Sequence, residues 1–376
     1  MKHDWKYIKL GDIISPAKVV RNGANKKFPV LSITMRDGIV FQSSRFKKSI
    51  ASVDTSDYKV VYNGQLVIAF PIDEGLIYTQ DIVDAGIMSP AYNVWNVDFL
   101  EIDRKFLVLY LHCPFSMAYY KSKLRGTTMR RRSMPKEDLL NMPLPVPSFS
   151  VQQSIVSELD KINELIRLKK EQLKDYDNLA QSIFYEMFGD EKYERRKLKD
   201  IVKVKSGQVS PLEDPYCDMV HVGPANIESN TGRLINLKTA KEENLISGKY
   251  LFDSSMVLYS KIRPNLNKVT IADFEGICSA DMYPLIPSKS IDKKFLLFIL
   301  KQKEFLSYAI ANSGRANIPK INREALLEYF TILPPLSLQL QFAERLALIE
   351  KQKEQISSII KDLETLLASR MQYWFD

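Results

Sequence analysis

Basic and amide side chains gather in a few short stretches of this 376-residue chain, and their chemistry is that of nucleic-acid contact. Lys and Arg neutralise phosphates, and Arg, Lys, Asn and Gln can hydrogen-bond to base edges in a DNA groove. For any single residue, the competing interpretation is a solvated surface charge. The candidate contact residues are Arg125, Arg130, Arg131, Arg132, Lys136, Arg315, Asn317, Lys320, Asn322, Arg323, Lys261, Arg263, Asn265, Asn267, Lys268, Lys18, Arg21, Asn22, Lys26 and Lys27.

The overall charge favours a polyanionic partner without establishing one. The formal net charge is +8 and the pI is about 9.0, but many basic proteins bind no nucleic acid. No run of eighteen apolar residues predicts a membrane span. The start, MKHDWKYIKLGDI, lacks an apolar signal core, and Cys113, Cys217 and Cys278 are scattered and odd in number. These features predict free thiols in a reducing compartment, the cytoplasm.

The sequence offers little that would support catalysis. SPAY at Ser89–Tyr92 superficially resembles the Asp/Asn-Pro-Pro-Tyr/Phe motif of adenine methyltransferases, but it lacks the second proline and the amide or carboxylate that would bond the target amine. A related stretch, SADM at Ser279–Met282, keeps only the serine. We interpret both as the entry to a strand. No glycine-rich nucleotide loop is visible, and His112, beside Cys113, lacks partners at metal-ligand spacing. A non-catalytic chain without a metal site is expected.

The elements that position the basic stretches are duplicated. KLGDI at Lys9–Ile13 corresponds to KLKDI at Lys197–Ile201, and KFLVLYL at Lys105–Leu111 corresponds to KFLLFIL at Lys294–Leu300. LVIA with MVLY, GIMS with GICS and MPKEDLL with INREALL keep the same order, and the offset varies only between 187 and 190. Because each repeat is far longer than a solenoid unit, we predict a duplicated domain.

Each half begins with a mixed α/β part. Apolar runs such as GQLVIAF and SSMVLYS predict strands, and NGQ and SNTG predict turns between them. FLVLYLHCPFSMAYYKSKL and FLLFILKQKEFLSYAI predict helices. The basic stretches 125–136 and 315–323 occupy corresponding positions in the two halves. The strand order does not follow from the sequence.

Each half ends in one long helix whose apolar positions step alternately by four and three residues, the spacing of a coiled-coil seam. At about 57 Å, each helix would overhang a domain of this size, so we favour a helix pair over a helix lying on its own domain. The seam positions of the first helix are Ile155, Leu159, Ile162, Ile166, Lys169, Leu173, Tyr176, Ala180, Ile183 and Met187. Those of the second helix are Phe342, Leu346, Ile349, Lys353, Ile356, Ile360, Leu363, Leu367, Arg370 and Trp374.

A proline-rich junction precedes each long helix. PVPSFSVQQ at Pro145–Gln153 and LPPLSLQL at Leu333–Leu340 end one element, because proline cannot donate a backbone hydrogen bond. Ser150 and Ser337 are the predicted helix N-caps. If the body is pseudo-symmetric, the helix ending in MQYWFD should finish near Trp5, so that the chain ends lie close together.

A globular domain, a proline junction and a long helix, all duplicated, resemble the specificity subunit of type I restriction–modification enzymes. The resemblance covers nearly the whole chain and rests on WKYIKLGDI, RRKLKDI, GIMSPAY, LLNMPLPVPSFSVQQSIVSELDKI, FTILPPLSLQLQFAERLALIEKQ and FYEMFGD. No single motif is specific, but the ordered set is. It implies a mixed α+β (α/β) fold with target-recognition domains at 1–148 and 191–335. It also implies spacer helices at 149–190 and 336–376 that pair as an antiparallel coiled coil with pseudo-two-fold symmetry.

The resemblance also implies a function. Each recognition domain would read one half of a split site in double-stranded DNA, and the helices would set the separation and dock two modification (methyltransferase) subunits. Restriction subunits would complete the complex. S-adenosylmethionine, ATP and Mg would belong to the partner subunits, with no cofactor in this chain. The competing prediction is a two-domain coiled-coil scaffold that binds proteins without DNA specificity.

Overall fold

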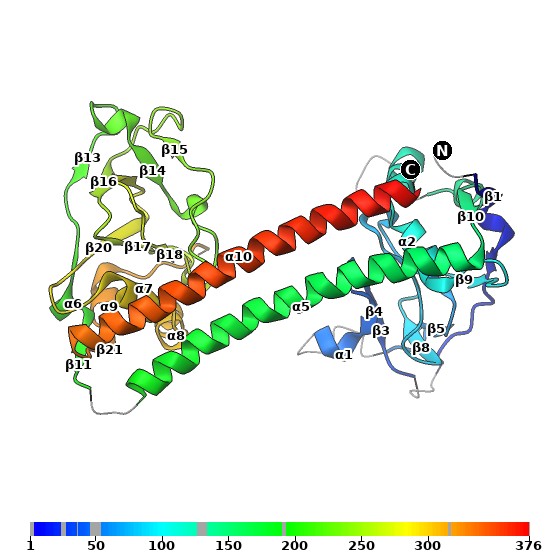
Figure 1. The fold of residues 1–376 in the computed structure, drawn as a ribbon, viewed down its shortest axis with the longest axis horizontal. Helices are drawn as coiled ribbons and strands as arrows, with labels where there is room; N and C mark the ends of the chain where they lie inside the picture. The colour runs from blue at the N-terminus through cyan, green and yellow to red at the C-terminus, as the bar shows by residue number, and fades with distance from the viewer. Residues whose placement is uncertain are drawn as a thin grey trace. The chain divides into compact units, whose positions relative to one another are not determined.

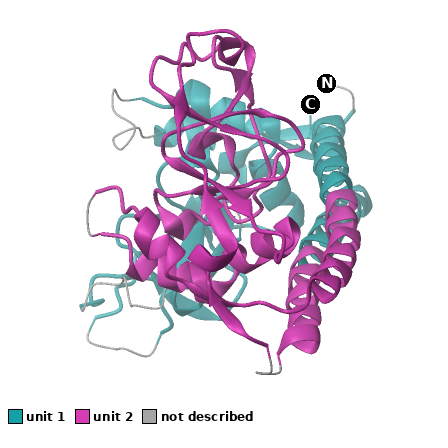
Figure 2. Cartoon of the chain, turned by 90° about the vertical axis from the view of Figure 1, so that its left-hand side faces the viewer, with its two compact units in different colours: residues 1–171, 357–376 teal, residues 172–356 magenta. Residues whose placement is uncertain are grey.

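The computed structural model describes residues 4–23, 28–35, 37–45, 54–125, 134–189, 193–314 and 317–375. They form two compact units (Figure 2). Unit 1 comprises Met1–Glu171 with Ser357–Asp376, and unit 2 comprises Gln172–Ile356. The boundaries between the units fall within the two long helices, α5 (Phe149–Phe188) and α10 (Leu336–Phe375), so each unit contains a segment of both helices.

Short antiparallel strands build unit 1 (Figure 1). One sheet has the strand order β2-β9-β6-β7, and β1–β10, β3–β4 and β5–β8 are further pairs. The strands are β1 (Lys6–Lys9), β2 (Ile14–Pro16), β3 (Leu31–Thr34), β4 (Gly38–Phe41), β5 (Lys59–Tyr62), β6 (Leu66–Ile68), β7 (Ile77–Thr79), β8 (Ala85–Met88), β9 (Asn93–Val97) and β10 (Pro143–Val146). The helices before α5 are η1 (Leu10–Asp12), α1 (Gln42–Arg45), η2 (Ile72–Glu74), α2 (Arg104–Leu111), α3 (Pro114–Lys123) and α4 (Lys136–Leu140).

Unit 2 has a β11–β21 pair and two larger sheets, of order β12-β20-β17-β18 and β13-β16-β19-β14-β15, in which only β14 and β19 pair in parallel. The strands are β11 (Arg195–Lys197), β12 (Val202–Val204), β13 (Gln208–Val209), β14 (Val220–Val222), β15 (Lys238–Thr239), β16 (Lys249–Phe252), β17 (Val257–Ser260), β18 (Val269–Thr270), β19 (Gly276–Cys278), β20 (Met282–Pro287) and β21 (Phe330–Ile332). The helices are α6 (Leu198–Ile201), η4 (Tyr216–Asp218), η5 (Pro224–Asn226), η6 (Pro264–Leu266), α7 (Lys293–Lys301), α8 (Lys303–Ala311) and α9 (Arg323–Leu327).

Stretches matched by the repeat occupy corresponding elements. LVIA and MVLY contribute to β6 and β17, and GIMS and GICS to β8 and β19. KFLVLYL and KFLLFIL form most of α2 and α7, and the order β2-β9-β6-β7 matches β12-β20-β17-β18. The predicted fold class, two similar mixed α/β domains in tandem with a long helix after each, is therefore confirmed.

The predicted helices at 106–124 and 295–310 are each two helices. In the first half His112 and Cys113 separate α2 from α3, because Pro114, at the first position of α3, lacks the N–H that a continuous helix needs. In the second half Gln302, with an extended backbone, separates α7 from α8. Pro114 marks the first break in the sequence, whereas no proline marks the break at Gln302.

The same aromatic contact closes the core of each unit. Phe106 of α2 lies 5.6 Å from Phe375, the last residue of α10, between ring centroids. Phe295 of α7 lies 5.3 Å from Phe188, the last residue of α5. All four rings are buried. Each unit therefore contains the end of one long helix and the beginning of the other.

A buried glutamine fixes each junction to its domain. The side chain of Gln152 accepts from the backbone N–H of Asp103 (2.7 Å) and donates to the carbonyls of Glu101 (2.9 Å) and Pro147 (2.8 Å). Gln339 makes the corresponding bonds to Asp292, Ser290 and Pro334, at 2.9, 3.0 and 2.7 Å. Both side chains are completely buried. Each glutamine thus satisfies three backbone groups of its domain.

The predicted N-caps were wrong. Helix α5 begins at Phe149 and α10 at Leu336, so Ser150 and Ser337 lie inside the first turn. The backbone N–H of Gln152 bonds to the carbonyl of Ser148. The prolines allow each helix to start two residues earlier than expected, because the first N–H groups of a helix have no intrahelical partner to lose.

Helices α5 and α10 run antiparallel to each other within each unit. In unit 1, Glu158 bonds to Arg370 and Lys170 to Glu364, so contacts later in α5 fall earlier in α10. In unit 2, Asp177 pairs with Lys353 at 2.8 Å and Phe184 with Phe342. Every predicted seam position of both helices is buried or half-buried. Burial therefore follows the four-three phase, including the polar seam positions Lys169, Lys353 and Arg370.

The two chain ends meet in unit 1, as the repeat predicted. The indole rings of Trp5 and Trp374 are stacked with centroids 6.4 Å apart. Both residues pack against the core that contains Phe106 and Leu159. Within the described residues, no helix is long and apolar enough to cross a membrane.

Candidate nucleic-acid interface

Two of the predicted contact stretches meet in unit 2, although they lie about fifty residues apart in the sequence. Ile262 and Lys320 form an antiparallel bridge. The backbone N–H of Arg263 bonds to the carbonyl of Pro319 at 2.7 Å, and that of Ile321 bonds to the carbonyl of Lys261 at 3.0 Å. The segments 261–268 and 317–323 therefore form one surface of the second domain.

An unusual backbone conformation shapes the first of these segments. Arg263 and Asn267 flank the 3-10 turn η6 and both have left-handed φ angles, +48° and +49°. That conformation is unfavourable for residues with a Cβ and rare for arginine. The neighbourhood holds it in place, because Asn267 donates its side-chain amide to the carbonyl of Lys301 at 3.3 Å and Pro264 is buried. No local sequence pattern predicts this turn at Arg263.

Several predicted contact residues are already bonded within unit 2. The Lys261 ammonium bonds to the carbonyl of Ala280 and lies 3.8 Å from Asp281. Burial lowers the pKa of Lys261, and the charge of Lys320 lowers it further. The Lys268 ammonium donates to the carbonyl of Pro224 at 2.6 Å. These two side chains hold loops of their own domain together.

The segment 317–323 contributes two more side chains with structural bonds. The Arg323 guanidinium donates to the carbonyl of Val204 at 3.1 Å, and the Asn322 side chain accepts from the N–H of Ala325 at 2.7 Å as the N-cap of α9. Both are exposed on their other sides. Arg323 and Asn322 can contact a ligand only through side-chain donors or acceptors that do not take part in these bonds.

Four side chains on this surface are exposed and uncommitted. Within the described part of unit 2, no hydrogen bond or ion pair engages the side chains of Arg263, Asn265, Asn317 and Lys320. Two of them carry a full positive charge and two carry an amide, the pair of chemistries that phosphate and base contacts require. The structure thus separates four available groups from five that support the loops: Lys261, Asn267, Lys268, Asn322 and Arg323.

In unit 1 the described candidates are fewer and more dispersed. Arg125 pairs with Asp138 at 3.4 Å, and the exposed Lys136 has its ammonium 5.5 Å from the centroid of the Trp95 ring. Arg21 is bonded to Asp57, and Lys18 is exposed. Predicted contact residues that lie outside the described residues are Lys26, Lys27, Arg130, Arg131, Arg132 and Arg315.

Asn22 is a structural residue. It is buried, and its side-chain amide lies 3.3 Å from the carbonyl of Thr55, to which it donates. Its backbone N–H bonds to the carbonyl of Tyr58. These contacts fix the loop that carries Arg21 and leave Asn22 inaccessible to a base edge.

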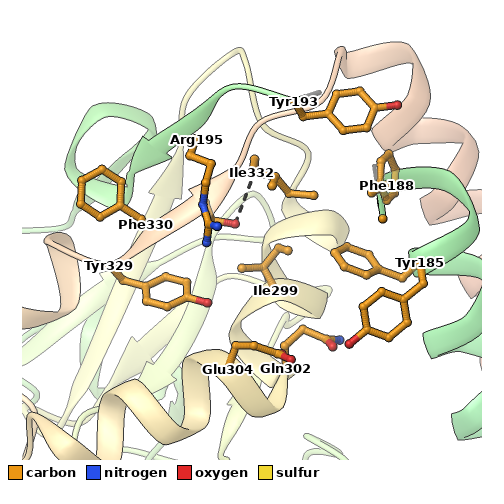
Figure 3. Close-up of a pocket in the computed structure, with 13 residues that line it drawn as sticks. Tyr185, Phe188, Tyr193, Arg195, Ile299, Gln302, Glu304, Tyr329, Phe330 and Ile332 are labelled. Atoms are coloured by element: carbon orange, nitrogen blue, oxygen red, sulfur yellow. Dashed lines mark hydrogen bonds between the residues drawn. The ribbon is translucent and has the colours of Figure 1, made fainter. Parts of the chain in front are cut away.

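An aromatic pocket of about 430 Å³ lies in unit 2, away from the predicted contact residues (Figure 3). Tyr185, Phe188 and Tyr193 line one side and Tyr329 and Phe330 the other. Arg195, between them, pairs through its backbone with Ile332, and the lining also includes Glu304. Because the positive charge of Arg195 is matched by the negative charge of Glu304, the lining lacks the excess of positive charge that a phosphate site needs. The aromatic run FYEMF contributes Phe184, Tyr185 and Phe188 to this lining.

The comparisons with known proteins agree with this architecture. Residues 2–175 and 190–365 each match the family model described as type I restriction modification DNA specificity domain. The chain is 38% identical over 149 residues to the type I restriction enzyme EcoDI specificity subunit of Escherichia coli, a match that covers 40% of this chain and 33% of that subunit. It is 23% identical over 418 aligned positions to the MjaVIII specificity subunit of Methanocaldococcus jannaschii, covering 97% and 92% of the two chains.

Two solved structures share the fold. One comes from work on complex assembly and conformational transition of the type I R-M system, with a TM-score of 0.59, 18% identity and coverage of 99% of this chain and 97% of that chain. The other is the type I restriction–modification S subunit of M. genitalium, with a TM-score of 0.52, 13% identity and coverage of 100% and 97%. Because the family model matches twice and spans most of the sequence, the chain belongs to the type I restriction modification DNA specificity domain family.

Proposed function

We propose that this chain is the DNA sequence-recognition subunit of a type I restriction–modification complex, in which it binds a split target and positions methyltransferase subunits on it. One observation carries the proposal. Within a chain that twice matches a DNA specificity domain, two separate basic and amide-rich stretches of unit 2 form a single surface with uncommitted Arg, Lys and Asn side chains. Such a surface supplies both phosphate and base contacts.

The helix pair supports docking of the modification subunits. In unit 1, Leu165 of α5 and Ile359 and Leu366 of α10 are exposed, and each comes one residue before a seam position. In an antiparallel pair these residues lie on the same flank of the seam. Lys170 and Glu364, each one residue after a seam position, form an ion pair of 2.8 Å on the other flank. An apolar flank beside a charged flank suits packing of a partner's helices on one side.

The chemistry of methylation is proposed to belong to the partners. S-adenosylmethionine would bind the modification subunits, and ATP and Mg the restriction subunits. In this chain the Ser89 hydroxyl accepts from the N–H of Ala91 at 3.3 Å, in the turn between β8 and β9, and the Ser279 hydroxyl accepts from Asp281 at 3.1 Å. Both serines therefore shape turns, which supports the interpretation of these stretches as strand entries. Adenine modification would need the base to be extruded into the partner's pocket.

The test begins with the target. Sequencing of methylated sites in a host with and without this gene should show one split motif that depends on the gene. The assembled complex is then titrated with duplex DNA carrying that motif at increasing salt. We expect the logarithm of the binding constant to fall steeply and linearly with the logarithm of salt concentration, by about 0.9 per phosphate contact. Unchanged methylation, with DNA binding that is weak and indifferent to sequence, would favour the protein scaffold.

A further inference from the structure

We propose that the exposed turn Arg263–Asn265, between β17 and β18, reads bases in the half-site bound by unit 2, and that Lys320 beside it contacts a phosphate. The inference rests on the proposed function, because it requires that the chain bind duplex DNA. It divides the predicted contact residues into base readers, a phosphate contact and side chains that hold the loops. Figure 1 labels β17 and β18 in the second domain, and η6 lies between these two strands in the chain.

The backbone of the turn is held in a costly conformation by contacts on several sides. Arg263 is left-handed, yet its N–H is engaged by Pro319 and the carbonyl of Leu266 accepts from Asn230 at 3.3 Å. Asn267, also left-handed, is bonded to the end of α7 through Lys301. Left-handed arginine persists only where the surroundings over-determine it, a condition that is frequent at functional sites. The consequence is a rigid base for the side chains that project from it.

The two projecting side chains have the chemistry of direct readout. The side chains of Arg263 and Asn265 are exposed and form no hydrogen bond or ion pair within the described residues. A guanidinium fork bonds both acceptors of guanine, O6 and N7, and an Asn amide bonds N6 and N7 of adenine. Because the two residues are separated only by Pro264, they can reach the same or adjacent base pairs. A rigid base reduces the entropy lost when such contacts form.

The neighbouring cations have different roles. Lys261 and Lys268 are bonded to carbonyls of their own domain, which leaves them poor contacts for DNA. Lys320 is exposed, carries no hydrogen bond or ion pair in the part of the chain that the structure describes, and pairs through its backbone with Ile262, the residue before Arg263. A lysine is a point charge without a fork, so it suits a phosphate better than a base edge.

The corresponding turn of unit 1 cannot serve in the same way. Between β6 and β7 the 3-10 turn η2 ends at Gly75, which is left-handed like Asn267. Counted back from that residue, Asp73 stands where Asn265 stands in unit 2, and Pro71 where Arg263 stands. A carboxylate cannot donate to guanine or adenine acceptors and is repelled by phosphate. The readout by Arg263 and Asn265 is therefore specific to unit 2.

The critical variant is Arg263→Gly. Glycine adopts the left-handed conformation without steric cost, so thermal stability should be unchanged or higher, while the guanidinium is lost. In the assembled complex, binding to the cognate duplex should weaken about ten- to hundredfold, the effect of losing one bidentate contact. Selection from DNA randomised in both half-sites should show relaxed preference at one or two positions of one half-site. Arg263→Lys should relax the same positions while keeping the salt dependence, and Asn265→Ala should relax the same or an adjacent position.

Lys320→Ala is the matched control. It should weaken binding to cognate and non-cognate duplexes alike and lower the salt slope by about 0.9, without a change in the selected sequence. A uniform loss with a reduced slope for Arg263→Gly would instead identify Arg263 as a phosphate contact and overturn the inference. So would an unchanged selected sequence. If the wild-type complex itself shows no split-site preference, the proposed function fails, and this outcome is distinct from a failure of Arg263 alone.

Discussion

Gln152 and Gln339 show how one side-chain type, used twice, positions an entire helix. Each sits in the first turn of a long helix and bonds to three backbone groups, including the N–H of the aspartate that caps α2 or α7. A glutamine side chain has one acceptor and two donors, so these bonds use the amide fully without leaving a buried polar atom unpaired. The direction in which each helix leaves its domain is thereby fixed.

Replacing Gln339 with alanine should destabilise unit 2. Three backbone groups, of which that of Pro334 is buried, would lose their partner, and the free energy of unfolding should fall by roughly 1–3 kcal/mol. Amide hydrogen exchange of Asp292 should also accelerate, because Gln339 accepts its N–H. The exposed Gln341 offers a matched control on the same helix, and Gln341→Ala should change stability by less than about 0.5 kcal/mol. Equal effects of the two substitutions would contradict the role of Gln339.

Glu158 makes the contact between α5 and α10 in unit 1 dependent on pH. Hydrogen bonds, first from Arg370 and then from Trp374, hold the pKa of Glu158 below its usual range. A carboxylate whose pKa is lower in the folded state stabilises that state above its ordinary pKa of about 4.3, and this stabilisation is lost as the pH falls through the lowered value. Glu158→Gln should therefore reduce the melting temperature at pH 7 but have little effect near pH 3. A reduction of equal size at both pH values would show that the charge is not responsible.

At the scale of elements, the periodic patterns predicted which helix faces are buried, but no local pattern predicted which side chains are engaged by distant parts of the chain. The four-three spacing predicted which side chains of both helices are buried, because residues three or four apart in a helix lie on the same face. The tie between Lys261 and Ala280 depends on how β17 and β20 pair, and no local pattern encodes that. Arg263 shows the same limit, since its turn is bonded to Pro319 and, through Asn267, to Lys301, both of which are distant in the sequence. Candidate residue types were therefore predictable, but which of them are available was not.

The length of the long helices should be changeable only in whole heptads. Seven residues added to α5 after Lys169, with seven added to the facing part of α10, keep the seam in phase and lengthen each helix by about 10 Å. If the helices set the distance between half-sites, as the resemblance implies, the unspecified spacer of the target should grow by about three base pairs at 3.4 Å each. The half-site sequences should stay the same.

A single residue added after Lys169 is the contrasting variant. It rotates Leu173, Tyr176 and the later seam positions by about 100° away from the partner helix, so stability and methylation should both fall. Sequencing of methylated sites and thermal denaturation would check the two variants together. Methylation at the original spacing by the heptad variant would show that helix length does not determine the target.

At the scale of the whole molecule, domains and long helices alternate along the chain, and the end of the last helix packs in the first unit. Its ends meet where Trp5 stacks on Trp374, and the other connection from a helix end to a domain start lies between Gly189 and Tyr193. Both connect the end of a long helix to the start of a domain, at corresponding places in the repeat. The first is a contact between side chains, and the second is the continuous polypeptide.

A circular permutant should therefore keep its function. A short glycine–serine linker from Asp376 to Met1, with new ends between Gly189 and Tyr193, alters no described element. We expect the permutant to direct methylation of the same motif. A permutant opened between Lys169 and Lys170, inside α5, is the control and should lose stability. If the first permutant methylates a different motif or none, the ends must contribute more than proximity.

Unit 1 also has a consequence for the order of events on the ribosome. Its core includes Phe375, yet 185 residues of unit 2, Gln172–Ile356, are synthesised between its two segments. At 5–20 residues per second, roughly ten to forty seconds pass between synthesis of the first segment of unit 1 and synthesis of the last turn of α10, which completes its core. The second domain, encoded later, is contiguous and is complete sooner after its own synthesis. Removal of Phe375 would thus destabilise the first domain, although the two are far apart in the sequence.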